Sequence, residues 1–387
     1  MEKIVYPKKI QSLFKEIIEE VKLVLDPDFI VIAGSFGKAA WLYNGDKLLS
    51  DFEFEFICYK KWSIKRKKAL VKKLNEKYSC DINLTGHLLE NVKKKVSSNY
   101  SNHFSGYVRL DFFDAFSNPQ ILYTKNNSGI NVNMSLEEVP AWEAWRLYVN
   151  RIGDILSLKL EENNNTERLN YYWLKIFEST ADVYLLVNKI YSKNISVRYE
   201  LFKEELLRND TLLNDKCVES YAIVKKALYA RKEHEIEIFD HNVLTDSNKM
   251  EIVSSWMEYL EEKVIVEEGL MKSDVLFSSN YLSSKFLQKK YLEVSNRFSV
   301  PISNGIRFLF HNKELLKLNF KFYNLKLSWR HLALILISEL YKELTSGYND
   351  FNRTRNILSN IISKKELSRF SDEDLLKTTL KLWKILR

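Results

Sequence analysis

Acidic residues alternate with phenylalanines over residues 51–56, in the order Asp-Phe-Glu-Phe-Glu-Phe. Side chains of a β-strand point alternately to its two faces, so a strand here places Asp51, Glu53 and Glu55 on one face and buries the phenylalanines on the other. Residues two apart on a strand lie roughly 6.5 Å apart at Cα, which lets their carboxylates share Mg²⁺. Bound Mg²⁺ can neutralise a departing pyrophosphate, so the pattern indicates metal-dependent phosphate chemistry.

A turn of small residues precedes the acidic stretch. The apolar segment 29–33 predicts a strand, and Gly34-Ser35 follows it directly. Glycine lets the backbone approach an anion closely, and the Ser35 hydroxyl with the amides of a helix start can hold phosphate oxygens. Lys38 can add a positive charge. The chain matches neither G-x-x-x-x-G-K-[ST] nor G-x-G-x-x-G, so this turn is not a Walker or dinucleotide-binding loop.

A third carboxylate on a neighbouring strand would complete the metal site. Asp111 has the apolar flanks of a buried strand, which we predict over residues 107–113. Asp114 and Asp81 are the alternatives. An acidic alternation can also simply face solvent, where charge discourages pairing between sheet edges. The turn upstream and the acid downstream favour the functional interpretation.

This arrangement resembles the nucleotidyltransferase superfamily of the DNA polymerase β type. That family has an apolar strand, Gly-Ser, then Asp-x-Asp or Asp-x-Glu on a strand and a third acid on a later strand. The matching residues are Gly34, Ser35, Asp51, Glu53 and Asp111, and Ser50 before the first acid also fits. The resemblance covers residues 29–115. The second acid is Glu where Asp is more frequent, and the gap after Gly-Ser is somewhat long.

The resemblance implies a role for each matched residue. Asp51, Glu53 and Asp111 would bind Mg²⁺, and Asp111 would accept the proton of the acceptor. Gly34 and Ser35, with Lys38, would bind the phosphates of an NTP such as ATP. The helical half is similar to that of small-molecule and antibiotic nucleotidyltransferases, where a helix behind the site carries a lysine near the triphosphate. Lys175 would be that lysine, although a surface lysine beside core aromatics explains the pattern equally.

The expected fold class is α+β. Residues 1–134 would form a nucleotidyltransferase-type α/β domain with a small mixed sheet, and residues 135–387 a mostly α-helical acceptor-binding domain, with a subdivision near 240–270 left open. The N-terminal half is expected to have strands at 29–33, 51–58, 79–84 and 107–113, and helices at 8–25, 37–43 and 62–77. Beyond Ser135, which opens a capping box with Glu138, helices are expected at 136–161, 167–192, 197–231, 248–268, 328–345, 350–364 and 371–386.

Composition sets the remaining expectations. The chain has 387 residues, 59 basic and 51 acidic, with a net charge of +8, which favours anionic ligands. Residues 60–73 are strongly basic and contain no acid, which indicates either a solvated helix face or a surface for RNA or phosphate.

Three cysteines without C-x-x-C spacing favour a reducing compartment. The sequence has no bilayer-length apolar run, so we expect a cytoplasmic protein without a membrane partner.

These observations predict a Mg²⁺-dependent enzyme that moves an NMP from an NTP to an acceptor hydroxyl or phosphate and releases pyrophosphate. A small molecule is the favoured acceptor. An RNA- or protein-directed nucleotidyltransferase and a non-catalytic nucleotide-binding regulatory protein of the same fold are the alternatives. His234, Asp240 and His241 are expected to lie in a solvated loop rather than at a metal.

Overall fold

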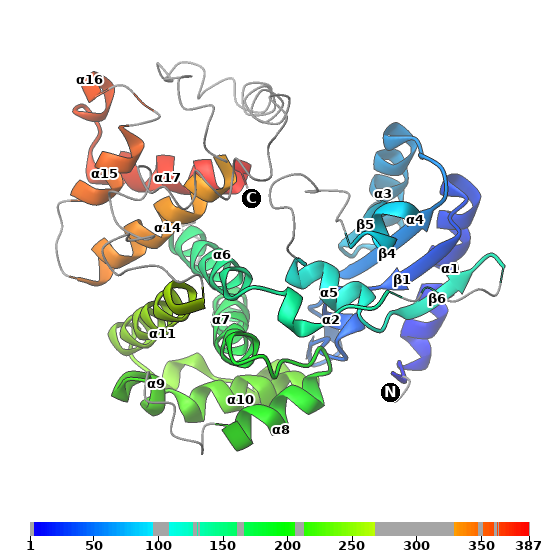
Figure 1. Ribbon diagram of the computed structural model, residues 1–387, viewed down its shortest axis with the longest axis horizontal. Helices are drawn as coiled ribbons and strands as arrows, with labels where there is room; N and C mark the ends of the chain where they lie inside the picture. The colour runs from blue at the N-terminus through cyan, green and yellow to red at the C-terminus, as the bar shows by residue number, and fades with distance from the viewer. Residues whose placement is uncertain are drawn as a thin grey trace.

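The computed structural model describes residues 4–95, 108–126, 130, 132–160, 166–205, 213–267, 329–346, 351–359, 362 and 364–386. A small mixed sheet forms near the N-terminus, and the chain that follows is largely helical (Figure 1). The expected α+β class is therefore confirmed at this level.

The sheet has the strand order β5-β4-β1-β6. Its strands are β1 (Phe29–Ile32), β4 (Phe52–Cys58), β5 (Ile82–Leu88) and β6 (Gln120–Thr124). β1 is antiparallel to both β4 and β6, whereas β4 and β5 are parallel. A parallel pair needs a crossover connection, which is supplied here by the basic helix α3 (Ile64–Tyr78). Within the described chain, β5 is one edge of the sheet.

Helices α1 (Lys8–Leu25) and α3 cover the phenylalanine face of β4. Ile10, Phe14, Ile17 and Val21 follow helical spacing and are buried, which gives α1 its apolar face. The helix ends at Leu25 because Asp26 turns into the left-handed conformation ahead of a proline. Predicted helices 8–25 and 62–77 and strands 29–33 and 51–58 are confirmed to within two residues.

Three other N-terminal expectations are wrong. The expected strand 107–113 is instead helix α5 (Leu110–Phe116), because its short apolar run also suits a buried helix. The expected strand 79–84 begins later, since Ser79 caps α3 in a left-handed conformation. The expected helix 37–43 is instead the short α2 (Gly34–Gly37), followed by the hairpin β2 (Tyr43–Asn44) and β3 (Lys47–Leu48). A short helix α4 (Leu89–Lys93) follows β5, and β6 had no sequence prediction.

The helical half contains the expected helices with more breaks. The capping box at Ser135 and Glu138 is confirmed, but it opens the 3₁₀ turn η1 (Leu136–Glu138), and α6 starts after Pro140. The expected helix 197–231 is divided into three, and the expected helix 350–364 is shortened to α15 (Asn352–Leu358). The helices are α6 (Ala141–Leu160), α7 (Thr166–Val187), α8 (Ile195–Glu205), α9 (Asp215–Glu219), α10 (Tyr221–Lys232), α11 (Asp246–Glu267), α14 (Trp329–Thr345), α15 (Asn352–Leu358), α16 (Lys364–Leu367) and α17 (Asp372–Leu386). Among the described residues, no helix combines the length and apolar character needed to cross a bilayer.

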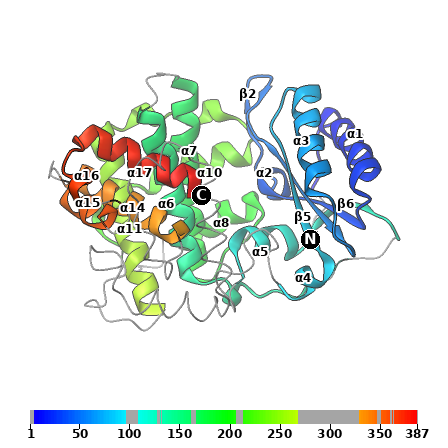
Figure 2. The same ribbon diagram turned by 90° about the horizontal axis from the view of Figure 1, so that it is seen from above.

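The two halves meet at the segment that follows α2 (Figure 2). Backbone hydrogen bonds join Ile195 N to Lys38 O at 3.0 Å and Tyr43 N to His234 O at 2.8 Å. The His234 ring stacks on Trp41 with centroids 3.9 Å apart. His241 is also buried, so the expectation of a solvated loop around these histidines is wrong. The helical half therefore holds the segment directly after the Gly-Ser turn.

Candidate active site

The acidic face of β4 forms as the alternation predicts. Phe52, Phe54 and Phe56 are buried in the core with α1 and α3. Asp51, Glu53 and Glu55 point to the opposite face and remain partly accessible. The packing of the phenylalanines thus determines which face the carboxylates occupy. A register slip of one residue would bury the carboxylates and expose the phenylalanines.

Strand β5 places a row of uncharged polar groups beside these acids. Glu53 is paired in register with Asn83, and Glu55 with Thr85. The Asn83 side-chain amide donates to an Asp51 carboxylate oxygen at 3.3 Å. The sequence predicted a carboxylate on a neighbouring strand, whereas β5 has the Asn83 amide beside Asp51 and Glu53 and the Thr85 hydroxyl beside Glu55.

Farther along the same face, Glu55 is paired with a histidine. His87 Nε2 lies 2.6 Å from Glu55 Oε2, and the imidazole is buried between this carboxylate and the rings of Phe112 and Phe116. His87 carried no recognisable spacing in the sequence, since its partner lies 32 residues away on another strand.

The Gly-Ser turn lies directly against Glu53. Gly34 opens α2 with φ +58°, and a Cβ built there would come within 2.6 Å of Glu53 Cδ and 2.9 Å of both carboxylate oxygens. A backbone hydrogen bond from Ala33 N to Glu53 O, 2.8 Å long, joins the two segments. Ser35 follows in the first turn of α2, where backbone amides have no intrahelical acceptor. A side chain at residue 34 would push the Glu53 carboxylate away from its present position.

Glu53 lies in a crowded electrostatic environment. Burial, together with the charges of Asp51 and Glu55, raises the pKa of Glu53 to about 7, and the positive charges of Lys38 and Lys175 oppose this rise only in part. Burial and repulsion from the two neighbouring acids therefore disfavour the ionised form of Glu53. A bound cation would relieve that repulsion.

Lys175 approaches the acids from the helical half. It lies on α7, and its charge acts on Glu53. The ammonium sits 4.3 Å from the centre of the Tyr171 ring and 5.8 Å from that of Tyr172. No ion pair of Lys175 with a carboxylate occurs among the residues that the structure describes. Its ammonium is therefore held over two tyrosine rings, within electrostatic range of Glu53.

Lys38 forms an ion pair with Asp114. Its ammonium lies 2.5 Å from Asp114 Oδ2, and the two side chains are 20% and 5% exposed. Tyr191 donates a hydrogen bond to the same carboxylate at 3.0 Å. Burial disfavours the charged amine, but Asp114 and Tyr191 outweigh this effect and raise the pKa of Lys38. Lys38 thus connects the turn to α5, and Asp114 is its partner.

Asp111 is not on the sheet. It lies in the first turn of α5 with its side chain 57% exposed, 2.6 Å from Arg109 Nη2. Partial burial acts to raise its pKa, but the guanidinium groups of Arg109 and Arg146 outweigh it and lower the pKa to about 2. Across the described ranges, no three His, Cys, Asp or Glu side chains are grouped as a metal site. Asp51, Glu53 and Asp111 are therefore not brought together as a set of three ligands.

The residues present nevertheless fit a hard cation. Asp51 and Glu53 supply carboxylate oxygens on one face, and Asn83 and Thr85 add neutral oxygens beside them. Mg²⁺ is commonly held by one or two carboxylates while water and substrate phosphate fill its other positions. The site thus fits a cation held by two acids rather than three.

A buried charge network lies behind the turn, and no sequence pattern predicted it. Arg231 binds Glu178 at 2.8 Å and donates to the carbonyl of Ala40 at 3.1 Å. Arg198 forms ion pairs with Asp182 and, at 3.7 Å, with Glu178. Burial opposes ionisation of Glu178, but Arg231 and Arg198 outweigh it and lower its pKa. These charges of α7, α8 and α10 hold the backbone that follows α2.

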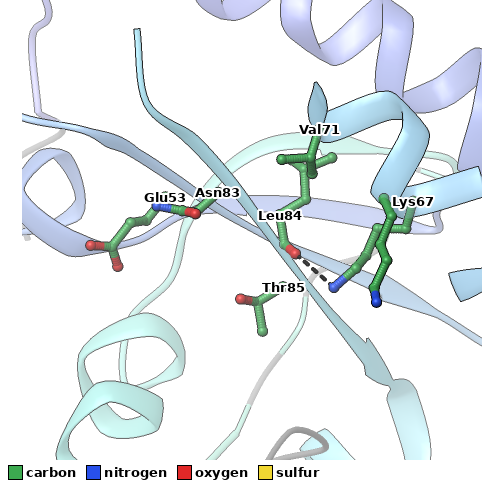
Figure 3. Close-up of a pocket in the computed structure, with 7 residues that line it drawn as sticks. Glu53, Lys67, Val71, Asn83, Leu84 and Thr85 are labelled. Carbon is green, nitrogen blue, oxygen red and sulfur yellow. Dashed lines mark hydrogen bonds between the residues drawn. The ribbon is translucent and has the colours of Figure 1, made fainter. Parts of the chain in front are cut away.

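A cavity of about 450 Å³ opens beside Glu53 (Figure 3). It is lined by Glu53, Lys67, Lys68, Val71, Asn83, Leu84 and Thr85. Figure 3 shows Glu53 and Thr85 on one side of the β5 ribbon and Lys67 and Val71 on the other. The cavity therefore runs past the edge strand from the acidic face to helix α3.

Comparison with known proteins finds no match for this chain among family models, curated proteins or solved structures.

Proposed function

We propose that this protein is a Mg²⁺-dependent nucleotidyltransferase that moves an NMP from an NTP to an acceptor, with a small molecule as the favoured acceptor. The observation that carries the proposal is the contact between the Glu53 carboxylate and Gly34. It brings a phosphate-sized turn and a pair of carboxylates within one site, although 18 residues separate them in the chain. A side chain at position 34 would displace the Glu53 carboxylate from the turn.

Residues of both halves would bind the NTP. The amides of the first turn of α2, with the Ser35 hydroxyl, would hold phosphate oxygens. Lys175 would approach the triphosphate from α7, because its charge acts on Glu53 and its ammonium is not paired with a described carboxylate. Lys38 would act indirectly, by holding the turn against Asp114.

Asp51 and Glu53 would hold Mg²⁺, and Asn83 or Thr85 would complete the protein ligands. The ion would supply charge neutralisation for the triphosphate and the departing pyrophosphate. An acceptor oxygen would form a bond to the α-phosphorus, and the bond from that phosphorus to the bridging oxygen of pyrophosphate would break. Asp111 suits the role of proton acceptor poorly, since a carboxylate with a pKa of about 2 is a weak base at neutral pH.

One observation favours the non-catalytic alternative. The expected third acid lies on α5 and is paired with Arg109, so a nucleotide could bind without efficient transfer. A regulatory protein of this kind would bind NTP but release no pyrophosphate. An RNA- or protein-directed transferase remains the other alternative, with the basic helix α3 as the surface that RNA would contact.

The deciding experiment measures pyrophosphate release with each of the four NTPs and Mg²⁺, using cell metabolite extract as a source of acceptors. We expect release that requires both Mg²⁺ and Asp51, and that is lost in Asp51→Asn. NTP binding by calorimetry without pyrophosphate release would favour the regulatory alternative. Absence of NTP binding would overturn the proposed site.

A further inference from the structure

Lys72, Lys73 and Lys77, in the second half of α3, are each paired with an acid. Acids of α1 and of α3 itself form these ion pairs, which are 2.8–3.9 Å long. In the described part of the chain, by contrast, no ion pair involves Lys65, Arg66 or Lys68. An unneutralised cluster of cations at the start of a helix attracts anions from solution.

This cationic end of α3 opens onto the cavity beside Glu53. Lys67 and Lys68 line it, and the half-buried Lys67 ammonium is oriented by a 3.1 Å hydrogen bond to the carbonyl of Leu84. Asn83 and Thr85 line the part of the cavity that leads to Glu53. One cavity therefore presents two ammonium groups, then neutral hydrogen-bonding groups, then the candidate metal-binding carboxylate.

We infer that this cavity binds the acceptor, and that the acceptor is a small molecule bearing a phosphate group and a free hydroxyl. The ammonium groups of Lys67 and Lys68 bind the phosphate through charge-assisted hydrogen bonds. Whichever of Asn83 and Thr85 does not hold Mg²⁺ binds a hydroxyl group of the acceptor, which directs the reacting oxygen toward Glu53. That the bound molecule is the acceptor rests on the proposed function, whereas the phosphate-binding site itself does not.

The shape of the site favours a small molecule over a polynucleotide. A volume of about 450 Å³ is in the range of small-ligand pockets. An RNA strand would instead track the exposed face of α3, and its affinity would depend on Lys65 and Arg66 as much as on Lys68. Binding of a small molecule should therefore depend on Lys68 but not on Lys65, whereas binding of RNA should depend on both lysines.

The test is isothermal titration calorimetry with glycerol 3-phosphate, in the absence of Mg²⁺ and NTP, with glycerol as the neutral control. We expect the full chain to bind glycerol 3-phosphate but not glycerol. Lys68→Gln should weaken binding by at least about tenfold, whereas Lys65→Gln, an equal loss of charge on the same helix, should change it by less than about twofold. Lys68 and Lys65 are exposed, so both variants should fold.

Three results would overturn the inference. These are no binding of glycerol 3-phosphate, equal weakening by Lys65→Gln and Lys68→Gln, or displacement of the probe by single-stranded RNA that depends equally on both lysines. The proposed function fails separately, because pyrophosphate release depends on Asp51. If glycerol 3-phosphate binds through Lys68 but no NTP is turned over, the phosphate site stands and the transferase proposal fails.

Discussion

The Glu53 carboxylate occupies the space that a side chain on residue 34 would need. A Cβ on Gly34 would approach Glu53 Cδ to 2.6 Å, and the backbone at Gly34 has a φ of +58°, which side-chain-bearing residues rarely adopt. Both the positive φ at Gly34 and the nearby Glu53 side chain therefore disfavour a side chain at this position.

Gly34→Ala should destabilise the protein by about 1–2 kcal/mol through backbone strain and displace Glu53 as well. Gly45→Ala is the matched control, since Gly45 has a φ of +54° and nothing lies within 4 Å of its added Cβ. Urea denaturation should show a loss of stability in both variants, but pyrophosphate release should fall only in Gly34→Ala. Equal activity in the two variants would show that the contact with Glu53 has no functional role.

Asp51→Asn and Glu53→Gln should each reduce pyrophosphate release by at least about a hundredfold, because each removes a carboxylate that would hold the cation, and the cation would neutralise the charge developing on phosphate. Glu76→Gln is the control, since this exposed acid lies on α3 and pairs with Lys72 at 3.8 Å. Steady-state assays at saturating Mg²⁺ check the prediction. Activity of Glu53→Gln above a tenth of the wild type would remove Glu53 from the metal site.

The stability of the metal-free protein should depend on pH through Glu53. The folded-state pKa of about 7 is above the usual 4.5, so the folded protein binds this proton more tightly than the unfolded chain. The free energy of unfolding therefore falls as the pH rises from about 4.5 to about 7, by on the order of 2 kcal/mol after allowance for solvent screening. Glu53→Gln should remove this component and be the more stable form at pH 8.

Urea denaturation in EDTA at pH 4.5, 6 and 8 measures this difference between wild type and Glu53→Gln. Adding Mg²⁺ at pH 8 should stabilise the wild type more than the variant, because a cation offsets the crowded charges. A difference between the two proteins that is constant with pH would mean that Glu53 titrates normally.

Lys38 and Lys175 should respond differently to the same substitution. Lys38→Met leaves Asp114 buried without its cation, which should cost about 3 kcal/mol of stability. Lys175→Met removes an ammonium that has no carboxylate partner among the described residues, so stability should change little while NTP binding weakens by about tenfold. Calorimetric NTP titration and urea denaturation of both variants separate a structural role from a role in NTP binding. If Lys38→Met weakened NTP binding and Lys175→Met lowered stability, the two assignments would be reversed.

Asp111→Asn should lower pyrophosphate release by less than about tenfold, in contrast to Asp51→Asn, because the Asp111 carboxylate is 57% exposed and bound to Arg109. The same assays with Asp81→Asn test the exposed acid that comes just before β5. A loss with Asp111→Asn as large as that with Asp51→Asn would show that α5 moves toward the sheet during turnover.

The sequence by itself determined the local parts of the site. Side-chain alternation on a strand follows from backbone geometry, so the acids of β4 and the burial of its phenylalanines could be read directly. The period of α1 and the Gly-Ser turn at the end of β1 are likewise local features. The short run around Asp111 fitted helix and strand alike, and its flanks could not decide between them.

Only the tertiary structure decided which groups meet. The pairing of Lys38 with Asp114 spans 76 positions, and the bond from Arg231 to Ala40 spans 191. The residues of β5 that lie beside Asp51 and Glu53 depend on the register between β4 and β5. These parallel strands are joined by a crossover helix, and no sequence pattern predicts their register. Such contacts arise from the packing of whole elements, because an ion pair forms wherever the buried faces of helices and sheet bring opposite charges together.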